Sequence, residues 1–289
     1  MSIKLRWLGY VCFEIVLPSG KVLVIDPYID YSPTAPVKCR EVTGADYIAI
    51  THGHYDHVTD VGPLVEKYDS KVICSHQVAQ PLADFFNLDP SRMIKVTAGN
   101  TLEFEDLSIE VKKAEHISLL PLMQAAYKRI TGEEADPELS LAELSKALAR
   151  ASSDRDRNDP TAEMRLKMQE AGIVGGEQLN FIFNTSDNLR IYIYSADAVE
   201  FLRKEVLESR ANIFCPQLGG VSARAAADLA ALSGAEIVIP THHDGEGLET
   251  MHARARKTAE YLGEKSKAEL LDIEHGKWYE IGVSVTSAS

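Results

Sequence analysis

The strongest constraint on this chain is a run of four potential metal ligands at residues 52–57, with the sequence His-Gly-His-Tyr-Asp-His, directly after an apolar segment. Imidazole and carboxylate groups suit zinc, iron or manganese. A helix or a strand alone could not point all four groups inward, whereas a tight loop with Gly53 in its middle can, because glycine tolerates unusual backbone angles. A histidine cluster that only packs on a loop would gain nothing from three close imidazoles. The run therefore predicts a metal site at the end of a strand.

The pattern along the rest of the chain is one of short apolar strands and amphipathic helices. Strands are predicted over residues 3–8, 12–17, 21–25, 47–50, 71–74, 93–96, 101–104, 107–114, 179–183, 190–194, 212–215, 236–239 and 278–283. Helices are predicted over residues 60–68, 77–86, 199–208, 223–233 and 247–263. After the opening strands the two types alternate, which is typical of α/β folds.

Residues 117–178 interrupt this alternation. Leu141, Leu144 and Leu148 share one face of a helix predicted over 137–151, and Asp159-Pro160 is a typical start of a second helix. Residues 172–176 contain three glycines and are predicted to form the hinge at which the segment rejoins the fold. The chain is thus expected to be a single domain over 1–289 with a helical insertion, which serves either as a lid or as a contact in a homo-oligomer.

Four more polar residues follow predicted strands and could belong to the same site. They are Asp26, His116, Asp197 and His242. Each alone is weak, because a polar residue after a strand is more often an ordinary turn residue. Together they are expected to converge, since functional residues gather where strands end.

These residues resemble the landmarks of the metallo-β-lactamase superfamily, whose H-x-H-x-D-H signature matches residues 52–57. The resemblance covers nearly the whole chain outside 117–178. It implies a four-layer αββα sandwich of two mixed β-sheets. It also implies two divalent metal ions, for which zinc is the preferred identity and manganese or iron are the alternatives. It also implies one metal on His52, His54 and His116, a second on Asp56, His57 and His242, Asp197 as a bridge and Asp26 as a buried brace. His243 stays open as an alternative to His242.

Within the superfamily, the likeness is greatest to the branch of L-ascorbate-6-phosphate lactonase and related metal-dependent hydrolases. It rests on the segments 7–10, 20–27, 216–220 and 240–245. Two features depart from that branch: Tyr10 stands where many members carry histidine, and the insertion is long. Both leave the substrate, rather than the chemistry, undefined.

The resemblance implies hydrolysis by a metal-bridging hydroxide, oriented by Asp56 and Asp197. Tyr10, His243 and Asp244 are candidates for proton transfer to the leaving group, with hydrogen-bonding support of the ligands as the preferred alternative for each. Gly219, Gly220 and Ser222 precede a predicted helix, where free N–H groups favour anions; an ordinary helix cap is the competing interpretation. The expected substrate is a small anionic lactone or phosphoester.

Composition restricts the alternatives. The net charge of −13 disfavours nucleic acid as a partner. No apolar run approaches the ~20 residues that span a bilayer, and the N-terminus lacks a signal-peptide pattern, so a cytoplasmic protein without membrane contact is expected. The other functions considered are a phosphodiesterase or nuclease, and a di-iron redox protein of the same fold, in which glutamate would replace His54.

Overall fold

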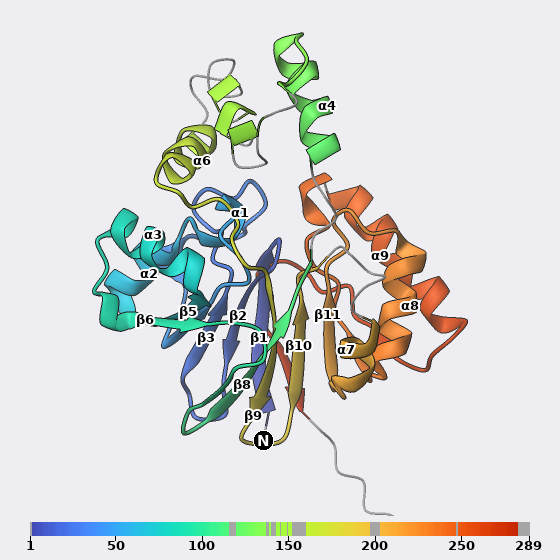
Figure 1. Ribbon diagram of the computed structural model, residues 1–289. Coiled ribbons are helices and arrows are strands. Elements are labelled where there is room, and N and C mark those ends of the chain that lie inside the picture. The colour runs from blue at the N-terminus through green and yellow to red at the C-terminus, as the bar shows by residue number, and fades with distance from the viewer. Residues whose placement is uncertain are drawn as a thin grey trace, which may run out of the picture.

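Two β-sheets lie face to face at the centre of the molecule, and helices cover both outer faces (Figure 1). The computed structural model describes residues 2–115, 120–136, 139, 143–144, 146–148, 150–151, 160–196, 203–246 and 248–282. The four-layer αββα sandwich predicted from the sequence is confirmed.

The first sheet has the order β14-β1-β2-β3-β4-β5-β6 among the described residues. Its strands are β1 (Ser2–Gly9), β2 (Cys12–Val16), β3 (Val22–Ile25), β4 (Tyr47–Ala49), β5 (Lys71–Ser75), β6 (Met93–Val96) and β14 (Tyr279–Gly282). Pairing is antiparallel from β14 to β3 and parallel from β3 to β6. The predicted metal-binding run follows β4, one of the parallel strands.

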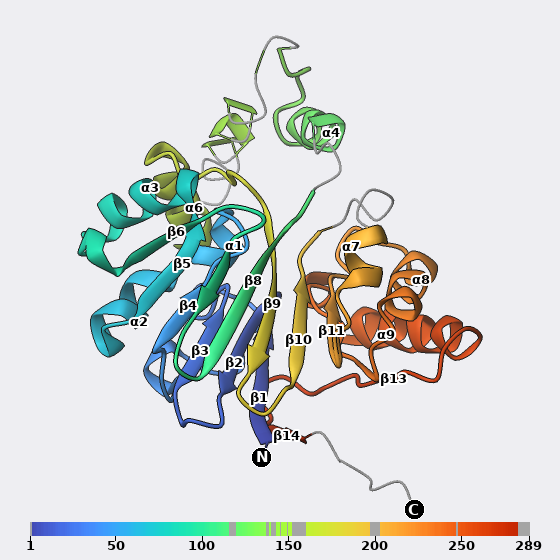
Figure 2. The ribbon, with the colours of Figure 1, turned by 60° about the horizontal axis from the view of Figure 1, so that its bottom comes forward.

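The second sheet has the order β13-β12-β11-β10-β9-β8-β7 and lies in front in Figure 2. Its strands are β7 (Thr101–Glu103), β8 (Leu107–Lys113), β9 (Leu179–Thr185), β10 (Arg190–Tyr194), β11 (Ile213–Pro216), β12 (Ile237–Val238) and β13 (Glu269–Leu270). The insertion leaves after β8 and returns before β9, which pair along seven residues. The long excursion of the chain therefore begins and ends at the same end of two neighbouring strands.

The core fills the space between the sheets, where side chains such as Leu5 of β1 and Phe181 of β9 are fully buried. On one outer face lie α2 (Val61–Tyr68) and α3 (His76–Phe86); on the other lie α7 (Arg203–Glu208), α8 (Ala223–Ser233) and α9 (Leu248–Gly263). No helix in the described part of the chain is long and apolar enough to cross a bilayer.

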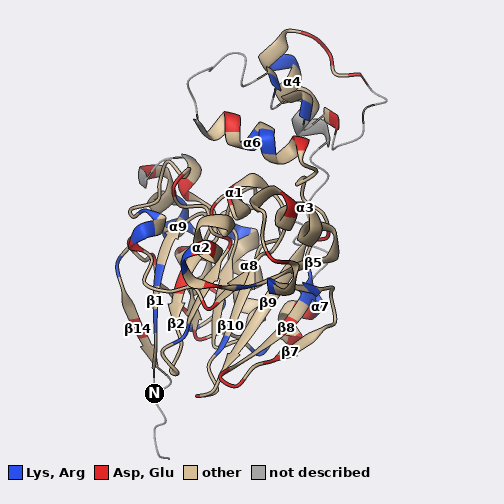
Figure 3. Ribbon diagram, turned by 90° about the vertical axis from the view of Figure 1, so that its left-hand side faces the viewer, with Lys and Arg blue, Asp and Glu red and all other residues tan. Residues whose placement is uncertain are grey.

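The insertion projects from one end of the sandwich, with Lys, Arg, Asp and Glu on its helices (Figure 3). The helix predicted from Pro160 is present as α6 (Pro160–Glu170). Another helix, α4 (Leu120–Thr131), was not predicted. Much of the range 137–151 lies outside the described residues, Leu141 included, but Leu144 and Leu148 are buried as the predicted helical face requires.

Candidate metal centre

The run at residues 52–57 is a bend followed by a short helix, α1 (Tyr55–Val58). Gly53 lies against the returning end of the insertion: its N–H donates to the carbonyl of Gly175 over 2.6 Å. A Cβ on Gly53 would come within 3.1 Å of that carbonyl oxygen, and one on Gly175 within 3.3 Å of His54 Nε2. The close approach of the two backbones, and the φ of 96° at Gly175, therefore favour glycine at both positions.

Asp56, His57 and His242 form a cluster whose ligand atoms all lie within 4.8 Å of one another. Asp56 Oδ2 is 3.5 Å from His242 Nε2 and 3.9 Å from His57 Nε2. Burial alone would raise the pKa of Asp56, but the neighbouring imidazoles, above all that of His57, outweigh it and hold that pKa below its usual range. A carboxylate with two imidazoles around one point is a donor set that suits zinc, manganese or iron.

The imidazole of His57 is oriented by a buried carboxylate. Its Nδ1 lies 2.7 Å from Asp26 Oδ2, and the same carboxylate accepts hydrogen bonds from the backbone N–H and the hydroxyl of Thr51. Burial opposes a charge on His57, but Asp26 and Asp56 raise its pKa overall. With the Nδ1 proton directed at Asp26, the lone pair of Nε2 faces Asp56 and His242. A carboxylate behind a histidine is the usual way in which proteins orient a metal ligand.

His52 and His54 point ring nitrogens at each other, with His52 Nε2 and His54 Nδ1 2.8 Å apart. Thr51 Oγ1 lies 3.0 Å from the other nitrogen of His52, which fixes that ring as well. The rings of His52 and His57 are in contact, with centroids 4.0 Å apart. The four predicted ligands of the run thus lie around one small volume.

The predicted site is described in part. His116 and Asp197 lie outside the described residues. The other predicted ligands come together from α1, the bend before it and the segment after β12: His52, His54, Asp56, His57 and His242. These five fit divalent metal ions by their chemistry, by the spacing of their donor atoms and by the buried groups that orient them.

His242, not its neighbour, faces the cluster. His243 is 3% exposed, and its ring stacks on Trp7 with centroids 5.2 Å apart. Neither of its ring nitrogens has a hydrogen bond of good geometry among the described residues, although the Thr241 backbone lies close enough to raise its pKa a little. Burial dominates and lowers the pKa of His243 to about 4. The geometry favours a packing role for His243 over the candidate role in proton transfer.

Tyr10 lies at the edge of the cluster, with its ring edge-on to His242 at a centroid distance of 5.0 Å. Burial, Tyr55 and the carboxylates of Asp56 and Asp244 raise the pKa of its hydroxyl well above the usual value. A hydroxyl with so high a pKa stays neutral and can donate a hydrogen bond near the site, but it is a weak acid.

The glycine loop before α8 lies beside the cluster. A Cβ built on Gly219 would be 2.7 Å from His242 Nδ1, so the loop backbone contacts this ligand directly. Gly220 has a φ of 75°, which favours glycine. The Ser222 hydroxyl accepts a hydrogen bond from Ala225 N–H, as in an ordinary helix cap. A helix cap and an anion site are therefore compatible in this loop, because the cap does not use the N–H groups of Gly219 and Gly220.

Sequence reasoning missed two contributors to this site, Thr51 and Gly175. Thr51 orients Asp26 and His52, and Gly175 contacts Gly53 at the bend. Thr51 could have been noticed, since it directly precedes the run, whereas Gly175 acts across more than 100 residues of sequence and no local pattern indicates such a pair. Asp244, a candidate for proton transfer or for hydrogen-bonding support, accepts hydrogen bonds from the backbone N–H of Tyr10, which is the supporting role.

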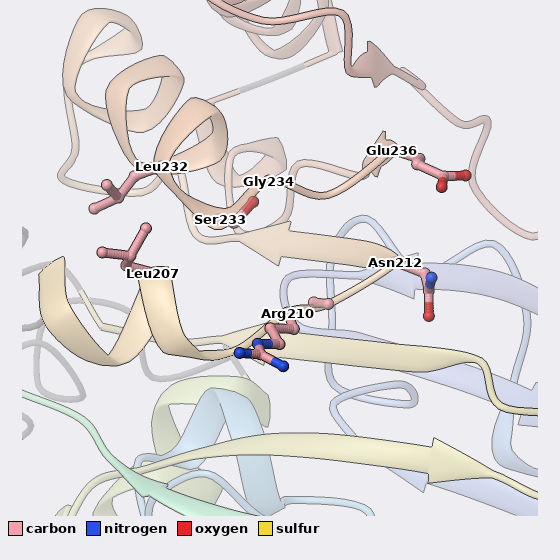
Figure 4. Close-up of a pocket in the computed structure, with 8 residues that line it drawn as sticks. Leu207, Arg210, Asn212, Leu232, Ser233, Gly234 and Glu236 are labelled. Carbon is pink, nitrogen blue, oxygen red and sulfur yellow. The ribbon is translucent and has the colours of Figure 1, made fainter.

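A hollow elsewhere in the fold is separate from this centre. It is lined by Leu207, Arg210, Ala211, Asn212, Leu232, Ser233, Gly234 and Glu236 (Figure 4). These residues come before β11 and β12, whereas His242 follows β12. The hollow therefore lies at the opposite ends of the strands, away from the cluster.

Part of the chain is similar in sequence to known proteins. Residues 21–132 match the model of the β-lactamase superfamily domain. A UPF0173 metal-dependent hydrolase of Metallosphaera sedula is 32% identical over 116 residues, which are 40% of this chain and 51% of that protein. The chain thus spans about half the length of this curated relative.

Two solved structures share the architecture over nearly the whole length. A metallo hydrolase of Ignicoccus hospitalis superposes with a TM-score of 0.68 at 15% identity, over 98% of this chain and all of that chain. The metallo-β-lactamase fold protein YhfI of Bacillus subtilis superposes with a TM-score of 0.59 at 13% identity, over 96% of this chain and 99% of the other. The chain therefore has the metallo-β-lactamase fold, and its residues 21–132 are similar to the β-lactamase superfamily domain.

Proposed function

We propose that this protein is a metal-dependent hydrolase that binds two divalent ions, zinc in preference to manganese or iron, in the centre described above. The observation that carries the proposal is the orientation of His57, whose Nδ1 is held by Asp26 while its Nε2 faces Asp56 and His242. The names of the curated relatives as metal-dependent hydrolases support it. His116 and Asp197 complete the two ligand sets in this proposal.

The residues of the chain divide the work around such a centre. Two bound ions would lower the pKa of a water molecule from ~15.7 towards ~7 and polarise the bond to be cleaved. Asp56 supplies negative charge next to the ions, and its low pKa keeps it ionised at neutral pH. Asp26 and Thr51 fix the directions of the histidine rings, so that little reorganisation is needed when a substrate binds.

The donor set favours hydrolysis over the di-iron redox alternative. That alternative has a glutamate in place of His54, whereas here His54 Nδ1 points at His52 Nε2 at 2.8 Å. Two imidazoles whose nitrogens lie this close together could both bind one ion, and imidazole ligands are typical of hydrolytic zinc sites.

The proposed substrate is a small anionic lactone or phosphoester. The Gly219-Gly220 loop lies against His242, so an anion bound to its free N–H groups would lie close to the ions. On another side, Arg165 of α6 places its guanidinium carbon 5.1 Å from the centroid of the Tyr55 ring, and α6 packs on α1. The Nε of Arg165 is buried and has no hydrogen-bond partner in the described part of the chain. A half-buried guanidinium beside Tyr55 of the run, with an Nε that has no partner among the described residues, would suit an anionic substrate.

The substrate class is tested with Gly220→Asp against Gly220→Asn. Both variants place a side chain of the same size at a φ of 75°, which these two residue types tolerate better than others, so they differ only in charge. We expect Gly220→Asp to raise KM for sugar-phosphate lactones and phosphodiesters far more than Gly220→Asn does. For neutral esters the two variants should have the same KM. Equal KM values for the two variants on anionic substrates would remove the loop from the anion site.

A further inference from the structure

The backbone of His242 has an unusual conformation that its neighbours must hold. Its φ is 55°, and that of Tyr10, on the turn after β1, is 48°. Side chains disfavour this left-handed region, so it persists where contacts enforce it. The two residues are joined directly, because the N–H of His242 donates to the carbonyl of Tyr10 over 2.8 Å. The position of His242 therefore depends on the position of Tyr10.

Asp244 holds Tyr10 from the other side. The N–H of Tyr10 donates to both carboxylate oxygens of Asp244, each at 3.1 Å. The hydroxyl of Thr34 donates to Asp244 Oδ2 over 2.5 Å, and His275 Nε2 lies 3.3 Å from the same oxygen. Asp244 is 1% exposed and its oxygens are fully engaged. It is therefore a fixed acceptor that ties together four segments of the chain, and it is not available to transfer protons to a substrate.

Trp7 adds a third restraint on the same peptide. Its indole N–H donates to the Tyr10 carbonyl over 2.9 Å, so that this oxygen accepts two hydrogen bonds. The indole ring in turn stacks on His275 with centroids 4.1 Å apart. The same few side chains thus bind both ends of the Tyr10 residue.

Two glycines make the close packing possible. A Cβ on Gly9 would lie 2.9 Å from Asp244 Oδ2 and 2.9 Å from Thr34 Oγ1, and a Cβ on Gly219 would lie 2.5 Å from the carbonyl oxygen of His242. All three distances are shorter than real Cβ contacts. The segment that carries His242 therefore packs closely on both sides, which restricts the conformation of its backbone.

We infer that Asp244 is the positioning residue for the His242 ligand. By fixing Tyr10 it fixes the backbone of His242, and so it sets Nε2 of that histidine 3.5 Å from Asp56 Oδ2. This inference rests on the proposed metal centre. It predicts that loss of Asp244 weakens one metal site, that of Asp56, His57 and His242, and leaves the site of His52 and His54 intact.

The experiment compares wild type with Asp244→Ala and Asp244→Asn, and uses Asp272→Asn as the matched control. Asp272 also pairs with a histidine, His252, at 2.6 Å, but not at the cluster. Zinc binding to the metal-free proteins is followed by calorimetry, and the ligand field by the visible spectrum of the cobalt(II) forms. We expect wild type and control to bind two ions alike. In Asp244→Ala one of the two sites should lose at least about tenfold in affinity and its cobalt bands should change, while the other site is unaltered.

Variants of graded severity keep the test decisive if Asp244→Ala does not fold. Asp244→Asn keeps the shape and one acceptor oxygen, and Thr34→Val removes a single donor to Asp244. Both should weaken the same site by less than the alanine variant does. Two-ion binding with wild-type affinities and unchanged cobalt spectra in all these variants would overturn the inference. Failure of wild type itself to bind metal would be a different result, because it would overturn the proposed function and the inference together.

Discussion

Acidification should destabilise the protein through His243 in particular. This histidine is 3% exposed and stacks on Trp7, and burial lowers its pKa from the ordinary 6.5 to about 4, against a smaller upward effect of Asp244. At a pH between about 4 and 6.5, the His243 imidazole is therefore neutral in the folded protein but protonated in the unfolded chain. Between these two pKa values the unfolded state binds more protons, so stability is present above pH ~6.5 and is lost as the pH falls towards ~4.

The size of this effect follows from the two pKa values. Each pKa unit is worth about 1.4 kcal/mol, so a difference between 6.5 and about 4 amounts to about 3 kcal/mol in full. Between about pH 7 and about pH 4.5, about 2 kcal/mol of this is lost. Replacing His243 by phenylalanine keeps a flat ring against Trp7 and removes the titrating group. The variant should therefore lose about 2 kcal/mol less than wild type over the same range.

The assay is urea unfolding of both proteins in the presence of a chelator, followed by far-UV circular dichroism at the two pH values. The chelator removes any contribution from metal release, and other titrating groups are common to both proteins. His76→Gln, at an exposed histidine, serves as the control and should behave as wild type. If His243→Phe and wild type lost the same free energy of unfolding on acidification, the account of a buried neutral imidazole would be refuted.

Two further predictions concern the metal ligands and the substrate. Asp26→Asn should weaken metal binding by about 10- to 100-fold in a calorimetric titration, because His57 would lose the carboxylate that orients it; unchanged affinity would mean that Asp26 only supports the fold. Arg165→Gln should raise KM for an anionic substrate by about tenfold with little change for a neutral ester. Lys167→Gln, which removes a solvent-exposed cation paired with Glu163 on the same helix, should change neither, and equal effects of the two variants would exclude a specific role for Arg165.

Most of the fold could be predicted from the sequence, because it depends on local apolar patterns. The strands of both sheets are short runs of apolar residues, and α6 begins at Pro160 as the Asp-Pro pair indicates. The strand Glu269–Leu270 was missed because two residues carry no periodicity. The helix Leu120–Thr131 was missed as well, because residues 117–178 were interpreted together as one insertion.

For the candidate site, the sequence indicates the candidate ligands but not the contacts that orient them. The run at residues 52–57 indicates metal by its spacing alone, and the family resemblance indicates His242. The contacts that orient these ligands, such as Gly53 with Gly175 and Tyr10 with Asp244, join residues far apart in the chain. Such pairs are set by tertiary packing, and a single sequence contains no periodic signal for them.

Metal content tests the central claim most directly. The protein, purified without chelator and then dialysed against zinc, manganese or iron, is analysed for bound metal per chain by elemental mass spectrometry. The arrangement of His52, His54, Asp56, His57 and His242 leads us to expect close to two ions per chain, and His54→Ala and Asp197→Ala should each lower this number and abolish hydrolysis while the circular dichroism spectrum is retained. A folded wild-type protein that retains none of the three metals would contradict the account.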